Sequence, residues 1–384
     1  MFLNDGQMTK LVGFRHRLHR RPEVSGEESE TARTVIDALA ETGADEIVSG
    51  LGGHGVAAIY RGRNEGPTVM IRAELDALPI KEISDIPYRS EIPGKGHLCG
   101  HDGHMTTLLA LGVGLGEKRP ARGRVILLFQ PAEENGAGAA AVLADPKFAA
   151  LKPDFVFALH NFPGLPLGHV ALRQGPVNCA SRGMKITLSG KTAHASSPEE
   201  GVAPTLAIAR LLGALTALGS GTAVDENFVR VTVTHCKIGE PAFGISPGHG
   251  EIWATLRTLT DERMTALVVT TEDLVRREAD ASGLKLSIGY SDVFHQCSNS
   301  AEAVAALREA VRQEGVSHDE GDRILPMRAS EDFGLFRRTA PAAMFFLGAG
   351  EGHPGLHNPD YDYPDALIGV GARIFMRTIR NILG

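Results

Sequence analysis

The stretch "MKITLS", residues 184–189, decides how this 384-residue chain is organised. Apolar residues alternate with polar ones along it, which is typical of a strand with one buried and one solvated face. Earlier apolar runs are different: "TVMI", "VILLF" and "FVFAL" are continuously apolar, as in strands buried on both faces of an α/β sheet. The change of pattern predicts two domains, which is also what the length favours.

The segment that begins near Ser181 predicts a ferredoxin-like module. The strands "VRVTVT" and "EIWATLR" repeat the alternation, and apolar residues spaced as in an amphipathic helix lie between residues 208 and 215. A helical stretch from about 261 to 281 precedes a last strand, "KLSIGY", which completes the order β-α-β-β-α-β. The α/β pattern then returns in "AAMFFLGAG" and in a closing helix from Ala366. We therefore expect a mixed-sheet domain of residues 1–180 and 294–384, interrupted by an inserted domain of residues 181–293.

Composition excludes several classes of function. The 39 Lys and Arg residues are outnumbered by 46 Asp and Glu, and no basic run is long enough to follow a phosphate backbone, so we expect no nucleic-acid partner. We find no apolar stretch of membrane-spanning length and no signal-like core in "MFLNDGQMTK", which predicts no membrane partner. Four widely spaced cysteines do not form a disulfide framework, and a cytoplasmic location is the expectation.

Two short motifs match functional patterns without the structural context these patterns need. Residues 50–55, "GLGGHG", fit a dinucleotide-binding loop but lead into the strand "VAAIYRG" instead of a helix, so they predict a hairpin turn. Residues 244–248, "GISPG", fit a serine nucleophile elbow, in which the residue after the serine donates its backbone N–H. That residue is Pro247, which has no N–H, so Ser246 is interpreted as a loop serine between two strands.

Chemically active side chains gather where the continuously apolar strands end. "TVMI" leads to Asp76, "VILLF" leads to Glu133 and Glu134, and "FVFAL" ends at His160. Since binding sites of open α/β sheets form at the carboxyl ends of strands, we expect these side chains to converge. Each residue alone has an ordinary structural interpretation, and their joint occurrence is what favours a site.

The stretch "GHLCGHDGHM", residues 96–105, adds Cys99 and His101 just before a predicted helix, "DGHMTTLLALGVG". Gly100 between them permits a tight backbone turn, and a thiol beside a helix N-terminus and a metal is expected as the thiolate. With Glu134, His160 and the late His357, these residues make five ligands of mixed sulfur, nitrogen and oxygen type. Such a set favours zinc, manganese, cobalt or nickel over magnesium or calcium. Within this stretch, His97 and His104 are interpreted as flanking residues.

Five ligands exceed the three of a usual catalytic zinc site and suit a pair of ions. The remaining carboxylate, Glu133, is then available as a general base, which takes a proton from water and delivers it to a leaving amine. Two other interpretations stay open at this point. One makes Cys99 a nucleophile activated by His101, and the other makes the chain a non-catalytic protein that binds metal or a small molecule.

A set of motifs in this order resembles the aminoacylase/carboxypeptidase family of dinuclear metallohydrolases, and within it the hippurate hydrolase and indole-acetyl-amino-acid hydrolase branch. These motifs, which span nearly the whole chain, are "RAELDALP", "CGHDGH", "QPAEE", "GKTAHASSP", "SEDF" and "GLHNPDYDYPD". The resemblance implies a zinc-peptidase-like α/β catalytic domain with an inserted ferredoxin-like lid that also forms a homodimer.

The resemblance also implies residue roles. It makes Glu133 the base and Asp76 a carboxylate that orients a ligand histidine or the metal pair. It makes His194 of the lid a stabiliser of the tetrahedral oxyanion, often in the partner subunit's site, where a turn-capping role is the structural alternative. The five implied metal ligands are Cys99, His101, Glu134, His160 and His357.

Substrate recognition is the least determined part of the sequence. Arg257 on a lid strand is a candidate to hold a substrate carboxylate, with a surface or interface role as the alternative. Relatives commonly carry Asn-Val-Ile-Pro where this chain has "GISP", so Gly244 replaces an asparagine that helps to bind substrate. The resulting prediction is a homodimeric amidohydrolase with two divalent ions per subunit, manganese or zinc first and cobalt or nickel next. It acts on N-acetyl or N-aroyl amino acids, with a dipeptide or another small amide as the alternative substrate.

Overall fold

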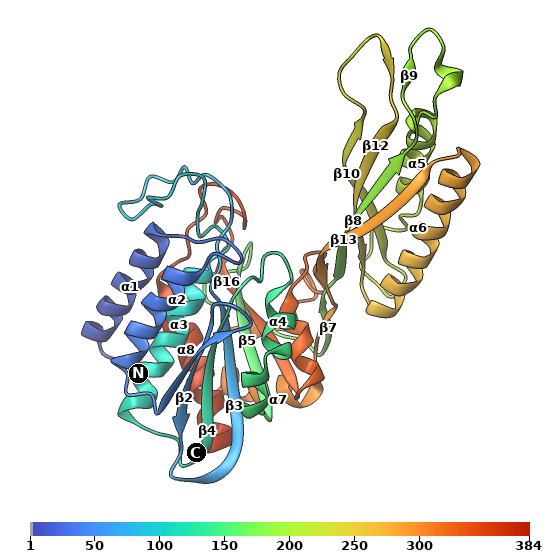
Figure 1. Cartoon of the computed structure of the whole chain (residues 1–384). Helices are drawn as coiled ribbons and strands as arrows, with labels where there is room; N and C mark the ends of the chain where they lie inside the picture. Colours follow the sequence, from blue (N-terminus) through green and yellow to red (C-terminus); the bar gives the residue numbers. More distant parts are fainter. Residues whose placement is uncertain (1–2) are drawn as a thin grey trace. The chain divides into compact units, whose positions relative to one another are not determined.

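The computed structural model describes residues 3–384, which divide into two compact units (Figure 1). Of these residues, the first unit comprises 3–177, Ser298–Leu325 and Asp332–Gly384, and the second comprises Asn178–Cys297 and Pro326–Glu331. The chain leaves and re-enters the first unit at the paired strands β7 (Gly175–Asn178) and β14 (Cys297–Asn299).

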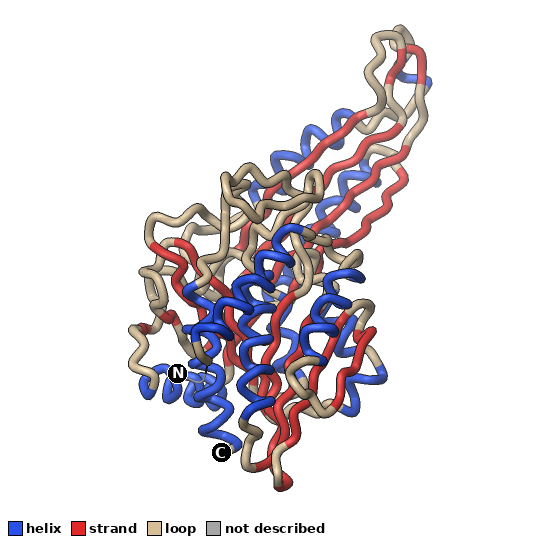
Figure 2. The backbone as a smooth tube through the Cα atoms, turned by 90° about the vertical axis from the view of Figure 1, so that its left-hand side faces the viewer, coloured by secondary structure: helices blue, strands red, loops and turns tan. Residues whose placement is uncertain are grey.

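An eight-stranded mixed sheet forms the centre of the first unit, in the order β1-β2-β4-β3-β5-β16-β6-β15 (Figure 2). β3 pairs in parallel with β4 and β5, and β5 pairs in parallel with β16, so the carboxyl ends of these four strands lie at one edge. The strands are β1 (Glu46–Leu51), β2 (Gly55–Arg61), β3 (Asn64–Glu74), β4 (Arg122–Gln130), β5 (Phe155–Pro163), β6 (Val170–Ala171), β15 (His318–Asp319) and β16 (Ala342–Gly350).

Both faces of this sheet are covered, because its central strands bury the side chains of their apolar runs, apart from the partly buried Phe155 at the start of β5. Ile71 of β3 lies opposite Leu127 and Phe157 and belongs to one large core cluster. That cluster also contains the apolar faces of α1 (Asp5–Arg20), α2 (Ser29–Ala40), α3 (His101–Glu117), α7 (Ala301–Gln313) and α8 (Ala366–Leu383). The next residue, Arg72, points to the other face and meets η3 (Asp332–Arg338), which lies with α4 (Gly138–Ala144) and η1 (Pro146–Ala150).

The second unit has the predicted ferredoxin-like topology. Its four antiparallel strands have the order β10-β12-β8-β13, and its core consists of apolar side chains such as Ile186, Leu211 and Ile252. The elements are β8 (Ala180–Ser189), α5 (Thr205–Ala217), β10 (Val229–Ile238), β12 (His249–Thr258), α6 (Asp261–Ala281) and β13 (Lys285–Phe294), with short β9 (Ala193–His194), η2 (Pro198–Glu200) and β11 (Ile245–Ser246).

The hairpin interpretation of "GLGGHG" is confirmed, whereas Ser246 lies in a two-residue strand and not in a loop as expected. "GLGGHG" forms the turn of the antiparallel hairpin β1-β2, with Gly50, Gly52 and Gly53 all at positive φ. Ser246 lies in β11, between β10 and β12, and not at a strand-to-helix elbow.

The second unit also includes residues that the sequence assigns to the catalytic domain. Pro326–Glu331 belongs to it because the backbone N–H of Cys179 donates to the Ala329 carbonyl, and the Arg257 guanidinium donates to the Arg328 carbonyl and the Ser330 hydroxyl. Such contacts between distant segments have no signal in hydrophobic periodicity.

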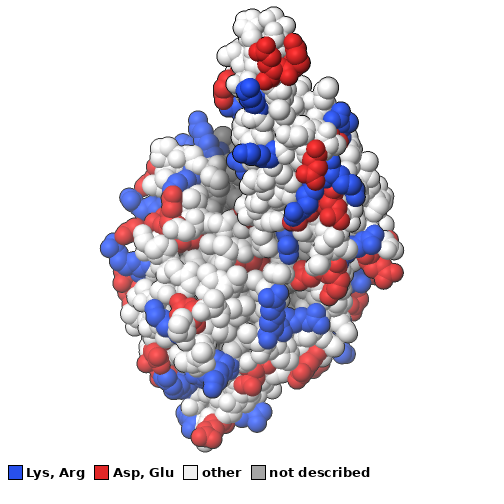
Figure 3. Space-filling model, turned by 45° about the vertical axis from the view of Figure 1, so that its right-hand side comes forward, with Lys and Arg blue, Asp and Glu red and all other residues white. Residues whose placement is uncertain are grey.

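The surface carries both charge signs. On the face shown in Figure 3, Lys and Arg side chains are interspersed with Asp and Glu over each unit. Among residues 3–384, no helix is both long enough and apolar enough to span a membrane.

Candidate metal centre

Three neighbouring strands of the first unit bring the predicted carboxylates and a histidine together at their carboxyl ends. Asp76 follows β3, is fully buried, and accepts hydrogen bonds from the Glu134 backbone N–H (2.9 Å) and the Ser25 hydroxyl (2.7 Å). Glu133 and Glu134 follow β4, and His160 lies within β5. The convergence expected at this edge of the sheet is confirmed.

Gly100 shapes the turn that presents Cys99 and His101. It has a φ of 88°, and an added Cβ would lie 2.4 Å from the Asn161 side-chain nitrogen, so no other residue fits there without displacement. The helix α3 begins at His101 itself, one residue earlier than the sequence indicates. The turn therefore brings a sulfur and an imidazole nitrogen to the same side of the backbone.

The five predicted ligands form two groups that share Cys99. The donor atoms of Cys99, His101 and His160 lie within 4.8 Å of one another, and so do those of Cys99, Glu134 and His357. Glu134 lies between the groups, with its two carboxylate oxygens 3.8 Å from His101 Nε2 and 3.6 Å from His357 Nε2. Glu133 lies in a further group with His101 and Glu134. One carboxylate placed between two imidazoles is an arrangement suited to two neighbouring cations.

Backbone carbonyls fix the tautomers of two of these histidines. His101 Nδ1 lies 2.8 Å from the Asp76 carbonyl, and His160 Nδ1 lies 2.8 Å from the Asn161 carbonyl. Because a carbonyl only accepts, each Nδ1 carries the proton and each neutral ring presents the Nε2 lone pair. These lone pairs face the other ligands, as in metal sites whose histidines are oriented by a second hydrogen bond.

The electrostatics of the site match a cation better than they match the uncharged chain. His101 Nε2 is buried without a hydrogen-bond partner among the described residues, which is costly for a polar atom. Burial disfavours the charged ring, but the Asp76 hydrogen bond and the charges of Glu74 and Glu134 raise the pKa of His101 to about 10. Carboxylates that stabilise a proton on His101 would equally stabilise a divalent ion. The residues present thus fit a pair of borderline divalent metals.

The surroundings of Cys99 do not favour a catalytic nucleophile. Burial, followed by the charges of Glu134 and Glu133, raises the pKa of its thiol well above the ordinary value, so a thiolate here requires a bound cation. Its Sγ lies 3.5 Å from His160 Nε2. Burial lowers the pKa of His160 to about 3, so this ring is neutral beside the thiol. These surroundings favour a metal ligand at Cys99 over a nucleophile activated by His101.

His104 is hydrogen-bonded to Asn161, the residue after the proposed ligand His160. The Asn161 backbone N–H donates to His104 Nε2 (3.2 Å), so Nδ1 holds the proton and donates to Glu74 (2.7 Å). Glu74 also pairs with the buried Arg72, which in turn contacts Asp332. This buried network was not predicted, although the charged residues in the otherwise apolar run "TVMIRAE" were a signal for it. His97 is fully buried as well, two residues from Cys99.

The two predicted lid residues lie in the second unit. The Ser196 backbone N–H donates to His194 Nδ1 (3.2 Å), so the neutral ring carries its proton on Nε2. His194 therefore takes part in a turn, as the structural alternative required, while its Nε2 stays exposed as a donor. Arg257 is partly buried and oriented by two hydrogen bonds, and no carboxylate among residues 3–384 forms an ion pair with it.

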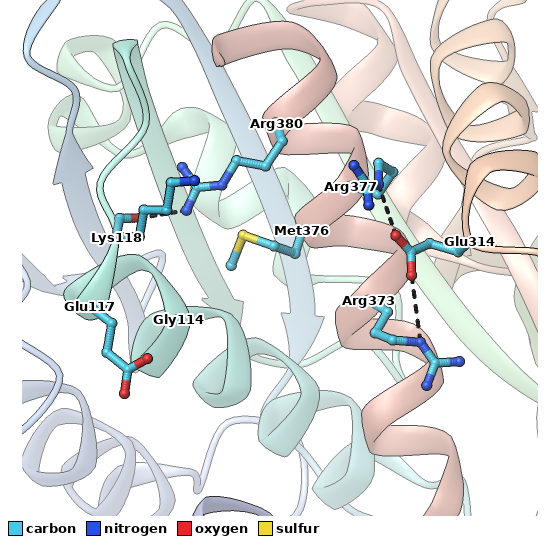
Figure 4. Close-up of a pocket in the computed structure, with 8 residues that line it drawn as sticks. All are labelled: Gly114, Glu117, Lys118, Glu314, Arg373, Met376, Arg377 and Arg380. Atoms are coloured by element: carbon cyan, nitrogen blue, oxygen red, sulfur yellow. Dashed lines mark hydrogen bonds and ion pairs between the residues drawn. The ribbon is translucent and has the colours of Figure 1, made fainter. Parts of the chain in front are cut away.

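A basic cavity of about 420 Å³ lies elsewhere in the first unit and contains none of the predicted site residues (Figure 4). Its arginines have structural partners: Arg377 donates to Glu314 (2.8 Å), and Arg380 donates to the Arg119 carbonyl (3.0 Å) after the end of α3. The cavity consequently does not compete with the ligand cluster as the candidate site.

The fold and the ligand cluster together define a two-unit α/β metallohydrolase. Residues 70–381 match the family described as Peptidase family M20/M25/M40, and the chain belongs to this family.

Relatives with assigned activities cover almost the whole chain. It is 31% identical over 372 residues to a hippurate hydrolase from Campylobacter jejuni, covering 97% of this chain and 95% of that protein. It is also 31% identical over 375 residues to an N-acetyl-L-cysteine deacetylase from Bacillus subtilis, covering 97% and 88%. A crystal structure of a dinuclear metal-binding M20 peptidase from Bacillus subtilis superimposes with a TM-score of 0.82 at 26% identity, covering 99% of both chains. The chain is thus similar over its full length to amidohydrolases of the family.

Proposed function

We propose that this protein is a dinuclear metal-dependent amidohydrolase that cleaves N-acyl or N-aroyl amino acids. The observation that carries the proposal is the pair of ligand groups that share Cys99, with the carboxylate of Glu133 beside His101 and Glu134. Cys99, His101, His160, Glu134 and His357 would hold the ions. A bound pair of divalent cations would polarise the scissile carbonyl and lower the pKa of a water molecule.

The protein's own residues would supply the remaining steps. Glu133 accepts the proton of the attacking water at a carboxylate oxygen and transfers it to the leaving amine nitrogen. Asp76 keeps His101 in its binding tautomer, and its buried position holds the backbone of Glu134 in place. His194, through its Nε2–H, is the proposed donor to the oxyanion, and Arg257 the proposed partner of the substrate carboxylate.

The substrate class is inferred from the activities of relatives, which act on hippurate, N-acetylcysteine and N-acetyldiaminopimelate. A dipeptide is the second candidate, since the same dinuclear chemistry cleaves either amide. We further propose a cytoplasmic homodimer formed through the second unit. All four cysteines are free, and Phe243 and Ile245 of the second unit expose large apolar surfaces.

The test begins with metal content per subunit in protein purified without chelator. Hydrolysis of hippurate, N-acetylcysteine and a dipeptide panel is then followed with manganese, zinc, cobalt or nickel added. About two ions per chain and metal-dependent release of a free amino acid would support the proposal. A chain that binds metal and hydrolyses nothing in the panel would favour the non-catalytic binding protein, and full activity in EDTA would overturn the mechanism.

A further inference from the structure

One fully buried arginine joins two segments that carry proposed ligands. Arg15 lies on the core-facing side of α1, between the buried apolar residues Leu11, Phe14 and Leu18. A guanidinium in such a place is tolerated only when its donors are matched by hydrogen-bonded acceptors. The identity of these acceptors therefore shows what Arg15 holds together.

Its acceptors come from two separate parts of the first unit. Nη1 donates both to Asp102 Oδ2 (2.9 Å) and to Asp362 Oδ1 (2.8 Å), while Nε donates to Asp365 Oδ1 (2.5 Å). Asp102 follows the proposed ligand His101 in the first turn of α3, and Asp362 lies five residues after the proposed ligand His357. A single nitrogen atom thus bridges the segment of one ligand to the segment of another.

Further contacts make this bridge rigid. Tyr88 accepts from Arg15 Nη2 (3.0 Å) and donates to Asp362 Oδ2 (2.6 Å), so Asp362 is held at both oxygens. The buried His19 lies between Asp102 (2.9 Å) and Glu82 (3.2 Å), which restrains Asp102 from a second side. The planar guanidinium fixes the directions of its acceptors as well as their distances.

The segment of His357 is the one that needs such restraint. His357 has a φ of 65°, which is uncommon for a residue with a side chain, and half of its side chain is exposed. The first turn of α3 is by contrast buried in the core. The His357 backbone N–H donates to the Leu98 carbonyl (2.8 Å), which restrains the backbone at one point, and the Arg15 bridge adds a second restraint through Asp362.

We propose that Arg15 is a positioning residue that sets the separation between His357 and the ligands at the start of α3. The inference rests on the proposed function, because it assumes that these residues bind metal. It requires that loss of the bridge weakens metal binding while the rest of the fold persists.

The test compares the wild-type protein with Arg15→Met, Arg15→Lys and Asp362→Asn in their metal-free forms. Each is titrated with Zn²⁺ alone in competition with a chromophoric chelator, and circular dichroism and thermal unfolding report folding. We expect at least one of the two zinc affinities to fall about 10- to 100-fold in Arg15→Met and Asp362→Asn. Arg15→Lys should remain weakened, because one ammonium cannot hold the bridge geometry.

Arg124→Met is the matched control. Arg124 also makes several hydrogen bonds, to Thr68, Ala150 and Leu151, but none to a residue of a ligand segment, so its zinc affinities should equal those of the wild type. Wild-type affinity in Arg15→Met, or full recovery in Arg15→Lys, would overturn the positioning role. If Arg15→Met does not fold, the zinc affinities of Asp362→Asn test the positioning role in its place. A wild-type chain that binds no zinc would overturn the proposed function itself, which separates the two failures.

Discussion

The two units bury different kinds of side chain. The first buries charged residues completely, among them Arg15, Arg72, Glu74 and Asp76. In the second unit, all of which is described, the buried side chains of Asn178–Cys297 are apolar, thiol, hydroxyl or amide groups, and the one buried charged residue is Glu331 at the end of Pro326–Glu331. An apolar interior needs only area and shape, whereas a charged interior needs specific partners, so buried charge marks where this protein has chemistry to perform.

The largest effect is expected for a substitution that removes the proposed general base and leaves the proposed metal ligands unchanged. Glu133→Gln should retain about two ions per chain but lose about 10²- to 10⁴-fold in kcat, because the amide cannot accept the proton of water. Glu134→Gln is the matched neighbour, and it should lose metal together with activity. Metal analysis and steady-state kinetics on both variants check this prediction. Wild-type turnover in Glu133→Gln would remove this residue from its role.

The difference in buried charge predicts a difference in stability. Arg72 donates to Gln130 (2.9 Å) and Asp332 (2.6 Å) and pairs with Glu74, so Arg72→Met leaves buried carboxylates without their cation. We expect the free energy of unfolding to fall by about 3–5 kcal/mol in urea titrations followed by circular dichroism. The exposed Arg210 of the second unit pairs with Glu278, and Arg210→Met should leave the unfolding midpoint unchanged. Similar losses in the two variants would contradict the comparison.

The pH dependence of the free energy of unfolding tests the role of buried charge in the first unit. Burial opposes a charge on His19, but its hydrogen bonds to Asp102 and Glu82 raise the pKa to about 9, above the unfolded value of about 6.5. Its contribution to stability is therefore complete below about pH 6.5 and is lost as the pH rises through about 9.

The difference in free energy of unfolding between the wild type and His19→Gln should accordingly decrease as the pH rises from about 6.5 to about 9. The metal content of the two proteins is kept the same throughout. A constant difference between wild type and His19→Gln across this range would mean that His19 is not held as a cation.

The smallest expected effect concerns substrate recognition by the second unit. A Cβ added at Gly244 meets no atom within 4 Å, so Gly244→Asn fits without strain. If an asparagine there binds the substrate, KM for N-acyl amino acids should fall about 2- to 10-fold, equivalent to one hydrogen bond of about 0.5–1.5 kcal/mol. Gly244→Ala is the control, because it replaces the same glycine but adds no side-chain amide. Equal KM values for the two variants would show that this chain recognises its substrate by other contacts.

Periodicity was sufficient for most of the fold. The alternation in "MKITLS" and the helical stretch 261–281 correspond to β8 and to α6, Asp261–Ala281, because side-chain periods of two and 3.6 follow directly from backbone geometry. The convergence of Asp76, Glu133, Glu134 and His160 was equally predictable from strand ends. The buried partners of the site were not, since nothing in the pattern pairs Arg15 with Asp362, 347 residues away.

The sequence by itself determined the two kinds of domain, the ferredoxin-like insertion and the set of residues available as ligands. Only the tertiary structure decided which atoms face one another: that His160 Nε2 lies 3.5 Å from Cys99 Sγ, that two backbone carbonyls select the histidine tautomers, and that one guanidinium joins the segments of His101 and His357. The physical reason is that burial depends on composition and spacing along the chain, whereas a hydrogen bond depends on distance and direction between groups brought together by folding.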